Sequence, residues 1–241
     1  MALHVDSVTF SYPSGGPVFG PFTFSARGGH IWAVLGSNGA GKSTLFRLLS
    51  TELSPAAGSI RATGTVELIP QGLSMPGRLT LREAFEYLAL VRRVPAKGRA
   101  DAVERALASV NLTGHGHLRL NQLSGGQRRR AVVGQALLAS PPILLMDEPS
   151  AGLDLDQRAT LRDTVRHLGS ERLVLISSHI VEDLAGVADH VLHIVAGRTV
   201  FAGPATEYLS VLPSGAGGGG LGGVEAWTAA YRHWNTTPEV A

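Results

Sequence analysis

A short glycine-rich segment is the feature that most constrains the fold of this chain. Its residues, in order, are Gly36, Ser37, Asn38, Gly39, Ala40, Gly41, Lys42, Ser43 and Thr44. They match the pattern G-x-x-x-x-G-K-[ST], which is typical of a loop that wraps around phosphate groups. The apolar run at 31–35 predicts a buried strand before the loop, and the run at 45–49 predicts a helix after it. This context favours a phosphate-binding loop over a glycine-rich turn with a surface lysine.

The chemistry of phosphate binding explains why this loop is rich in glycine and carries Lys42 and Ser43. Glycines let the backbone curl so that several N–H groups point at one anion, and the helix that follows adds a partial positive charge at its N-terminus. We therefore expect Lys42 to reach the β- and γ-phosphates of a nucleotide, and Ser43 to hold Mg²⁺.

The composition excludes several classes of protein. The 241 residues include no cysteine, which rules out a disulfide framework and a thiolate metal site. The formal net charge of +2 is too small to indicate a nucleic-acid partner. No run approaches the ~20 apolar residues that a membrane span needs, and the N-terminus lacks the pattern of a secretion signal. We expect a cytoplasmic protein.

Hydrophobic patterning divides the chain into strands and helices. Alternation predicts two antiparallel strands at 3–10 and 18–25, and a further short strand pair within 58–69. Helical spacing of apolar residues begins at Leu81 and again near residue 100, which places a helical insert at about 76–135. Three more buried strands, separated by helices, indicate a mostly parallel sheet and lie at 143–146, 173–176 and 191–195.

The C-terminal part has a different composition. A glycine-rich stretch at 213–223 predicts a flexible linker after a main domain at 1–212. The tail at 224–241 contains a helix whose apolar face is formed by Val224, Trp227, Tyr231 and Trp234. This face either docks on the chain's own domain or binds a partner, and the sequence does not decide between the two.

Two further segments carry candidate site residues. Asp147 and Glu148 follow an apolar strand, where an aspartate commonly holds Mg²⁺. The glutamate beside it can accept a proton from an attacking water. A second anion site is expected where a helix opens with a serine N-cap and exposed glycine N–H groups, at Ser124, Gly125, Gly126 and Gln127.

Five motifs occur in a fixed order along the chain. They are the loop at 36–44, Leu-Ser-Gly-Gly-Gln at 123–127, Ile-Leu-Leu-Met-Asp-Glu-Pro at 143–149, Ser-Ala-Gly-Leu-Asp at 150–154 and Ser-Ser-His at 177–179. Over about residues 3–212 the chain resembles the ATP-binding cassette (ABC) family, and within it the nucleotide-binding subunit of an ABC transporter. The resemblance implies an α/β fold, with a P-loop NTPase core built on a mostly parallel sheet with flanking helices, an antiparallel β subdomain and an α-helical insert.

The resemblance also implies an ATPase that uses ATP and Mg²⁺, with roles for individual residues. Tyr12 would stack on the adenine ring, and Gln71 would touch Mg²⁺ and the attacking water. Asp147 would be a ligand of Mg²⁺ beside the loop serine. Glu148 would be the general base, and His179 would contact the γ-phosphate.

Partners follow from the same resemblance. Two cassettes would pair head to tail, so that 124–127 of one contacts the γ-phosphate bound at 36–44 of the other, with Asp154 crossing the interface. A dimer of identical chains and a dimer with a different ABC subunit both remain open. A transmembrane permease would hold the transported substrate and would keep the chain on the inner face of the cell membrane.

The direction of transport is suggested by two stretches. Residues 76–94 and 127–138 resemble subunits that export drugs, antibiotics or polysaccharides, so we expect an exporter. The alternatives are the energy subunit of an importer and a non-transport ABC ATPase of translation or DNA repair. Translation proteins of this family usually join two cassettes, whereas this chain has one, and no heptad run indicates the coiled coil of the repair proteins. The hairpin expected between Ser59 and Gln71 is short for the family.

Overall fold

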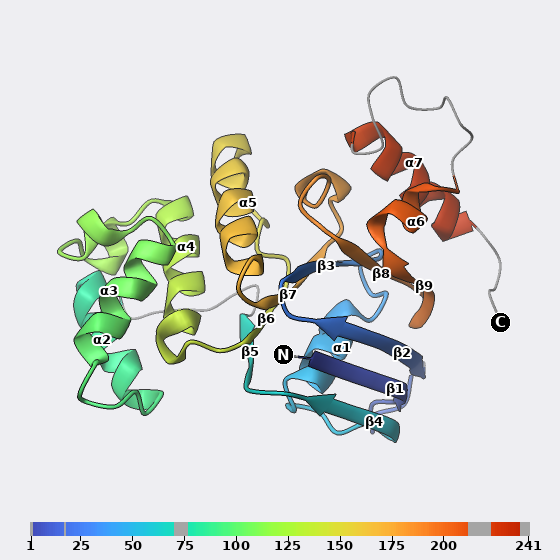
Figure 1. Cartoon of the computed structure of the whole chain (residues 1–241), viewed down its shortest axis with the longest axis horizontal. Coiled ribbons are helices and arrows are strands. Elements are labelled where there is room, and N and C mark those ends of the chain that lie inside the picture. Colours follow the sequence, from blue (N-terminus) through green and yellow to red (C-terminus); the bar gives the residue numbers. More distant parts are fainter. Residues whose placement is uncertain (1, 17, 70–76, 212–222, 237–241) are drawn as a thin grey trace.

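The structure of the chain is a computed structural model that describes residues 2–16, 18–69, 77–211 and 223–236 (Figure 1). Its centre is a six-stranded sheet in the order β5-β6-β7-β3-β8-β9. The first five strands are parallel, and β9 runs antiparallel to β8. The strands are β3 (His30–Leu35), β5 (Val66–Ile69), β6 (Ile143–Met146), β7 (Leu173–Ser178), β8 (His190–Val195) and β9 (Arg198–Pro204).

The central sheet confirms most of the strands expected from the sequence. The three buried runs after residue 140 are β6, β7 and β8, and the run before the glycine-rich loop is β3. Strand β9 has no counterpart among the predictions, because its residues are mostly half-exposed and show no clean alternation.

A three-stranded antiparallel sheet, in the order β2-β1-β4, lies beside the central sheet (Figure 1). Strands β1 (Ala2–Phe10) and β2 (Phe19–Arg27) confirm the predicted antiparallel pair. Their buried side chains alternate with exposed ones along much of each strand, as a sheet with one solvent face requires.

The strand pair and hairpin expected within 58–69 are wrong. Both strands form, but β4 (Ala57–Ala62) pairs with β1, whereas β5 pairs with β6 in the central sheet. Gly64 lies between them with a φ of +111°, and a Cβ there would lie 2.5 Å from Cγ of Pro142. Because β4 and β5 pair with different strands, the chain crosses from one sheet to the other at Gly64. Local patterning does not reveal which sheet a short strand joins.

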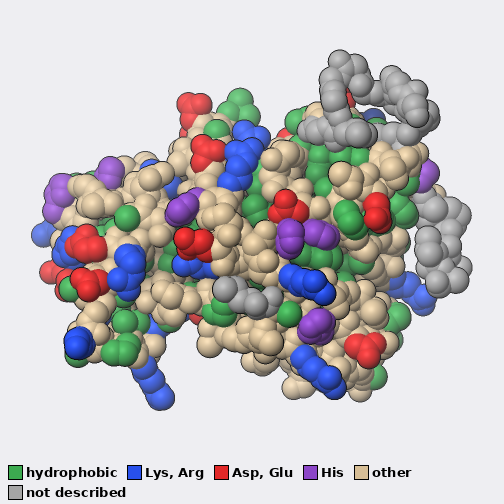
Figure 2. All heavy atoms as spheres, viewed as in Figure 1, with side chains coloured by type: hydrophobic (Ala, Val, Ile, Leu, Met, Phe, Trp, Pro, Cys, Tyr) green, Lys and Arg blue, Asp and Glu red, His purple; other side chains and the backbone are tan. Residues whose placement is uncertain are grey.

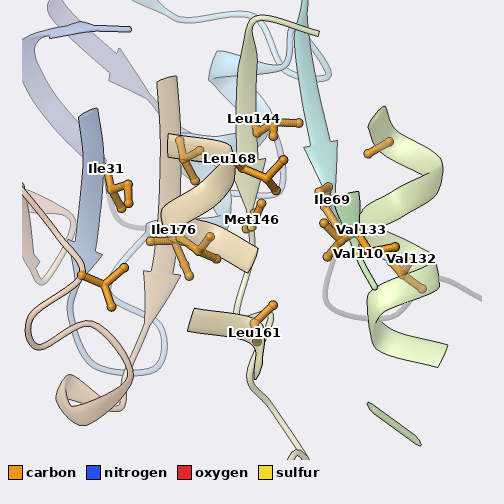
Figure 3. Packing of buried hydrophobic residues seen from close by; sticks show 14 of the residues in the cluster. Ile31, Ile69, Val110, Val132, Val133, Leu144, Met146, Leu161, Leu168 and Ile176 are labelled. Atoms are coloured by element: carbon orange, nitrogen blue, oxygen red, sulfur yellow. The ribbon is translucent and has the colours of Figure 1, made fainter. Parts of the chain in front are cut away.

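The central sheet is buried on both faces. On β3, Ile31, Ala33 and Leu35 pack into one hydrophobic cluster, while Trp32 and Val34 pack into another. Helix α5 (Leu155–Gly169) covers the first face, as Figure 3 shows for Leu161 and Leu168 beside the strands.

Helix α1 (Lys42–Leu49) packs on the opposite face, between the two sheets. Its side chains Phe46 and Leu49 share a cluster with Phe22 of the antiparallel sheet and Leu145 of the central sheet. Burial on both sides fixes the helix, and with it the loop that precedes it.

Three helices form a separate layer beyond α5 (Figure 1). They are α2 (Leu81–Val91), α3 (Arg99–Ser109) and α4 (Gly125–Ala136). Helices α2 and α3 confirm the segments expected from apolar spacing, and α4 confirms the helix expected to open after the N-cap Ser124. Helix α2 begins with a capping box, in which Thr80 Oγ1 accepts from the N–H of Glu83 at 3.2 Å and the Glu83 carboxylate accepts from the N–H of Thr80 at 2.8 Å.

The tail helix α7 (Val224–Thr236) docks on the rest of the chain, which confirms the first of the two interpretations. Trp227 is 2% exposed, and Trp234 stacks on Tyr208 of helix α6 (Ala205–Leu209) at a centroid distance of 6.0 Å. Tyr231 stacks on the buried His193 of β8 at 5.0 Å. Residues 212–222, with most of the predicted linker, lie outside the described part of the chain.

The described part of the chain also contains four short 3₁₀ helices, namely η1 (Thr113–His115), η2 (Leu120–Gln122), η3 (Leu137–Ala139) and η4 (Val181–Asp183). Among the described residues, none of the helices combines the length and the apolarity that crossing a membrane requires. On the face drawn in Figure 2, Lys and Arg side chains are interspersed with Asp and Glu side chains.

Candidate active site

The glycine-rich loop connects the end of β3 to the start of α1. Its backbone has positive φ angles of 152°, 80° and 108° at Gly36, Gly39 and Gly41. A Cβ at Gly36 would lie 2.4 Å from the carbonyl oxygen of Ile194, and one at Gly41 would lie 2.7 Å from the ring of Phe19. The loop therefore needs glycine for its conformation and, at its two ends, for space.

Lys42 is folded back into this loop. It is only 5% exposed, and its ammonium donates to the carbonyl oxygens of Gly36 at 2.8 Å and Ser37 at 3.2 Å. The same nitrogen lies 3.5 Å from Oε1 of Glu148. A buried ammonium requires such partners, so its position is set by the loop and by one acid that follows β6.

Asp147 and Glu148 directly follow β6. Because β3, β6 and β7 are parallel neighbours, their carboxyl ends meet at one edge of the sheet, which is where open α/β sheets bind ligands. The hydroxyl of Ser177, in β7, donates to Oδ1 of Asp147 at 2.6 Å and accepts from the N–H of Glu148 at 2.9 Å. Glu148 has a φ of 45°, an uncommon left-handed conformation that this bond helps to hold.

His179 is a further polar side chain at this edge, next to Glu148. Its Nδ1 lies 3.1 Å from Oε2 of Glu148, and its side chain is 41% exposed. Glu148 thus lies between a buried ammonium and an accessible imidazole. The structure brings together Lys42, Glu148 and His179 from three elements that are far apart in the sequence.

Ser177 and Arg129 are site residues that the sequence predictions did not assign. The register pairs Met146 with Ile176, so the next residue on each strand, Asp147 and Ser177, must be neighbours. Knowledge of that pairing would have been enough to find Ser177.

Arg129, from α4, is buried beneath the acidic segment. Its Nε donates to the carbonyl oxygen of Pro149 at 2.8 Å, and its Nη2 lies 3.4 Å and 3.3 Å from the carbonyl oxygens of Asp147 and Glu148. Burial lowers the pKa of Arg129, and the nearby Asp147 partly opposes this shift. Within the arginine-rich run 128–130, no local signal distinguishes this residue from an exposed one.

Tyr12 lies beside the start of α1. Its hydroxyl is 3.1 Å from Oγ1 of Thr44, and its half-buried ring meets Phe10 and Phe19 edge to face at 4.8 Å and 6.1 Å. The ring is therefore close to the glycine-rich loop, as its predicted role requires. Gln71, by contrast, lies outside the described residues.

The segment at 124–127 begins α4 with the expected N-cap. Ser124 Oγ accepts from the N–H of Gln127 at 3.2 Å, and the amide oxygen of Gln127 accepts from the N–H of Ser124 at 2.9 Å. Asp154 caps α5 in the same way, because its Oδ1 accepts from the N–H of Gln157 at 2.9 Å. Both caps are local, so the predicted contacts of Ser124 and Asp154 with a second chain stay predictions.

Comparison with known proteins identifies the family. The family model described as ABC transporter matches residues 19–151, more than half of the chain. The chain is 33% identical over 222 residues to the ABC transporter ATP-binding/permease protein Rv1747 of Mycobacterium tuberculosis, covering 85% of this chain and 26% of that protein. It is 31% identical to the Phosphonates import ATP-binding protein PhnC 1 of a Ruegeria species, covering 83% of this chain and 88% of that one.

Two more comparisons agree. The chain is 33% identical to the Daunorubicin resistance ATP-binding protein DrrA3 of Streptomyces coeruleorubidus, covering 74% of this chain and 61% of that protein. A solved structure of a metal-chelate type ABC transporter in an inward-facing conformation matches with a TM-score of 0.76 and 26% identity, over 84% of this chain and 82% of that one.

These matches confirm the predicted α/β fold with its added antiparallel sheet and helical layer. The chain spans about a quarter of the first of these relatives and about three fifths of the third. With the phosphate-binding loop, the acidic pair and the histidine gathered at one sheet edge, this chain belongs to the ABC transporter family and carries its ATP-binding, ATP-hydrolysing domain, which uses ATP and Mg²⁺.

Proposed function

We propose that this chain is the energy subunit of an ABC exporter, which hydrolyses ATP at this site and drives a separate transmembrane permease. The observation that supports the proposal most directly is the position of Glu148, whose two carboxylate oxygens lie 3.5 Å from the ammonium of Lys42 and 3.1 Å from the imidazole of His179. This carboxylate lies beside the phosphate loop and is held between two polar groups. It is therefore placed to accept a proton from the water that attacks the γ-phosphate.

The residues at the loop fit a triphosphate with Mg²⁺. The positive φ angles of the glycines are of the kind that turns successive backbone N–H groups towards one anion, and Lys42 would exchange its carbonyl partners for phosphate oxygens. Ser43 offers an exposed hydroxyl and Asp147 a carboxylate, which is the kind of donor set that Mg²⁺ completes with substrate phosphates. Bound there, Mg²⁺ would offset the negative charge that develops on the phosphates.

Other residues complete the binding of ATP. All nine residues of the loop at 36–44 surround the phosphates, and Tyr12 stacks on the adenine ring. Gln71 contacts Mg²⁺ and the attacking water, a role carried by the sequence resemblance alone. Glu148 removes a proton from that water, while His179 contacts the γ-phosphate.

We infer a head-to-tail dimer of cassettes. Ser124, Gly125, Gly126 and Gln127 of one subunit close over the γ-phosphate held by the other, and Asp154 lies at the interface. ATP then joins the two subunits, and its hydrolysis separates them. The exposure of Ser124, Gly125 and Asp154 in the single chain supports this arrangement.

The dimer can be tested with a hydrolysis-deficient chain. Glu148→Gln keeps the loop, Ser43 and Asp147, so the variant should bind ATP and accumulate as a dimer. Light scattering should show twice the monomer mass with MgATP and the monomer mass without it. Adding Ser124→Arg to Glu148→Gln should abolish the dimer. The matched control for Glu148→Gln is Glu171→Gln, which changes an exposed acid remote from the site and should not produce a dimer with MgATP. A monomer with ATP bound would contradict a dimer of identical chains.

Export rather than import is the finer part of the proposal. It is supported by the resemblance at 76–94 and 127–138 and by the name of the daunorubicin resistance relative. The import protein among the relatives favours the alternative, an importer energy subunit. The two are distinguished by reconstituting the chain with its permease in vesicles and adding ATP outside: an exporter loads the lumen with substrate, and an importer does not.

The proposed organisation follows from the same function. The ATPase domain spans 1–212 with its helical insert at about 76–135, the linker spans 213–223, and the tail spans 224–241. The chain would work at the inner face of the cell membrane, held there by a permease.

A further inference from the structure

Asp183 is a buried acid that the proposed catalytic residues do not include. It ends η4, four residues after His179, and is 7% exposed. Its Oδ2 accepts a short hydrogen bond of 2.5 Å from the hydroxyl of Ser150, and its Oδ1 lies 3.4 Å from Nη1 of Arg158. A buried carboxylate needs such charged or polar partners, so its position is closely determined.

The two partners of Asp183 both act on the loop that follows Glu148: Ser150 lies in it, and Arg158 of α5 bonds to its end. Ser150 is two residues after Glu148 and begins a tight turn, in which the N–H of Leu153 donates to the carbonyl oxygen of Ser150 at 3.1 Å. Arg158, on α5, donates from Nε to the carbonyl oxygen of Leu153 at 3.0 Å. Asp183 and Arg158 therefore hold this turn at both of its ends.

The surroundings leave little freedom for this bridge. A cavity of only about 10 Å³ lies beside it, lined in part by Leu161, Val165 and Ile176. On its other side, Val181 and Leu184 pack in the same hydrophobic cluster as Trp227 of the tail helix. The segment that carries Asp183 is thus fixed by the core.

We propose that Asp183 is a positioning residue for ATP hydrolysis: through Ser150 and Arg158 it ties the segment after His179 to the loop after Glu148. The bridge keeps the 3.1 Å contact between His179 and Glu148 in place when the nucleotide changes. This inference rests on the proposed function of Glu148 as general base. The carboxylate of Asp183 is bonded to Ser150 and paired with Arg158, and it acts on Glu148 through these two residues.

Two substitutions break the bridge with little change of shape. Asp183→Asn removes the negative charge and turns one acceptor oxygen into an NH₂ donor, so the charge-assisted bonds to Ser150 and Arg158 cannot both be kept. Ser150→Ala removes the hydroxyl and leaves the carboxylate with Arg158. Ser150→Thr keeps a hydroxyl and should restore the bond. Glu182→Gln neutralises the adjacent exposed acid of η4 and is the matched control for charge.

Three measurements on the full chain test the proposal: kcat for ATP, the affinity for a fluorescent ATP analogue, and hydrogen exchange of peptides covering 147–154 and 177–184. For Asp183→Asn and Ser150→Ala we expect kcat to fall roughly 10- to 100-fold, as for other small misplacements of reacting groups. Affinity should change less than about twofold, because the phosphate loop is untouched, and both peptides should exchange faster. Ser150→Thr and Glu182→Gln should match the parent.

The outcomes separate this inference from the function on which it rests. Parent-like kcat and exchange in Asp183→Asn, with a parent that hydrolyses ATP, would overturn the bridge alone. A parallel loss of kcat, affinity and protection throughout the chain would also overturn it, because Asp183 would then only support the fold. If the parent hydrolyses no ATP, the proposed function fails, and exchange in the two peptides still decides whether Asp183 couples them.

Discussion

Removing the hydroxyl of Ser177 should destabilise the chain and disturb the acidic pair together. The Ser177→Ala substitution deletes the bond donated to Oδ1 of Asp147 at 2.6 Å and leaves the N–H of Glu148 without the acceptor that it has at 2.9 Å. A hydrogen bond to a charged group contributes about 1.5–3 kcal/mol, and an unsatisfied donor in a partly buried site costs about 1 kcal/mol or more. We expect a loss of about 3 kcal/mol in the free energy of unfolding.

Urea denaturation followed by tryptophan fluorescence measures this loss. With a slope of about 3 kcal/mol per molar urea, the midpoint should fall by about 1 M. Ser170→Ala is the matched control, because Ser170 is exposed and its hydroxyl donates only to the carbonyl oxygen of His167. The free energy of unfolding of Ser170→Ala should be less than about 0.5 kcal/mol below that of the parent. If Ser177→Ala lost no more than Ser170→Ala, the hydroxyl would not hold the acidic pair, and the reasoning would fail.

Three more predictions follow from single side chains. Lys42→Ala should weaken binding of a fluorescent ATP analogue strongly, whereas Lys97→Ala, at the other lysine of the chain, should leave it unchanged; equal affinities would refute the assignment of the phosphate loop. Trp227→Ala should cost about 3–5 kcal/mol in unfolding free energy by emptying the site under the tail helix, and a change in urea midpoint of less than 0.3 M would show that α7 is not firmly docked. Burial lowers the pKa of His193 to about 4, whereas the same histidine in the unfolded chain has a pKa near 6.5. As the pH falls, the unfolded chain is therefore protonated at His193 before the folded chain is. The free energy of unfolding should be highest above about pH 6.5 and should decline by about 3 kcal/mol as the pH falls towards 4. Urea titrations from pH 7 to 4 should show a smaller decline in His193→Phe, and parallel curves would contradict this.

The sequence predicted the phosphate loop and the strands of the parallel sheet because both depend on local signals. Glycine spacing sets the loop, and unbroken apolar runs such as 143–146 indicate strands buried on both faces. The pairing of β4 and β5 in different sheets was predicted wrongly, since each strand pairs with residues that are 48 to 77 positions away in the chain.

The same distinction applies to the site. Lys42, Glu148 and His179 lie in recognisable motifs, and the structure places the Glu148 carboxylate 3.5 Å from the ammonium of Lys42 and 3.1 Å from the imidazole of His179. Ser177 lies in the Ser-Ser-His motif but was given no role, and Arg129 is one arginine of three; both acquire their roles only through strand register and helix packing. The supporting residues of a site are therefore harder to predict than the residues that carry its chemistry.

In the proposed function, Glu148 is the general base for ATP hydrolysis. The most direct test compares ATP hydrolysis by the parent and by Glu148→Gln at saturating MgATP, with nucleotide binding measured on the same samples. An amide cannot take a proton from water, so hydrolysis should fall roughly 10²- to 10⁴-fold while ATP remains bound. A Glu148→Gln chain that hydrolyses ATP at the parent rate would contradict the claim.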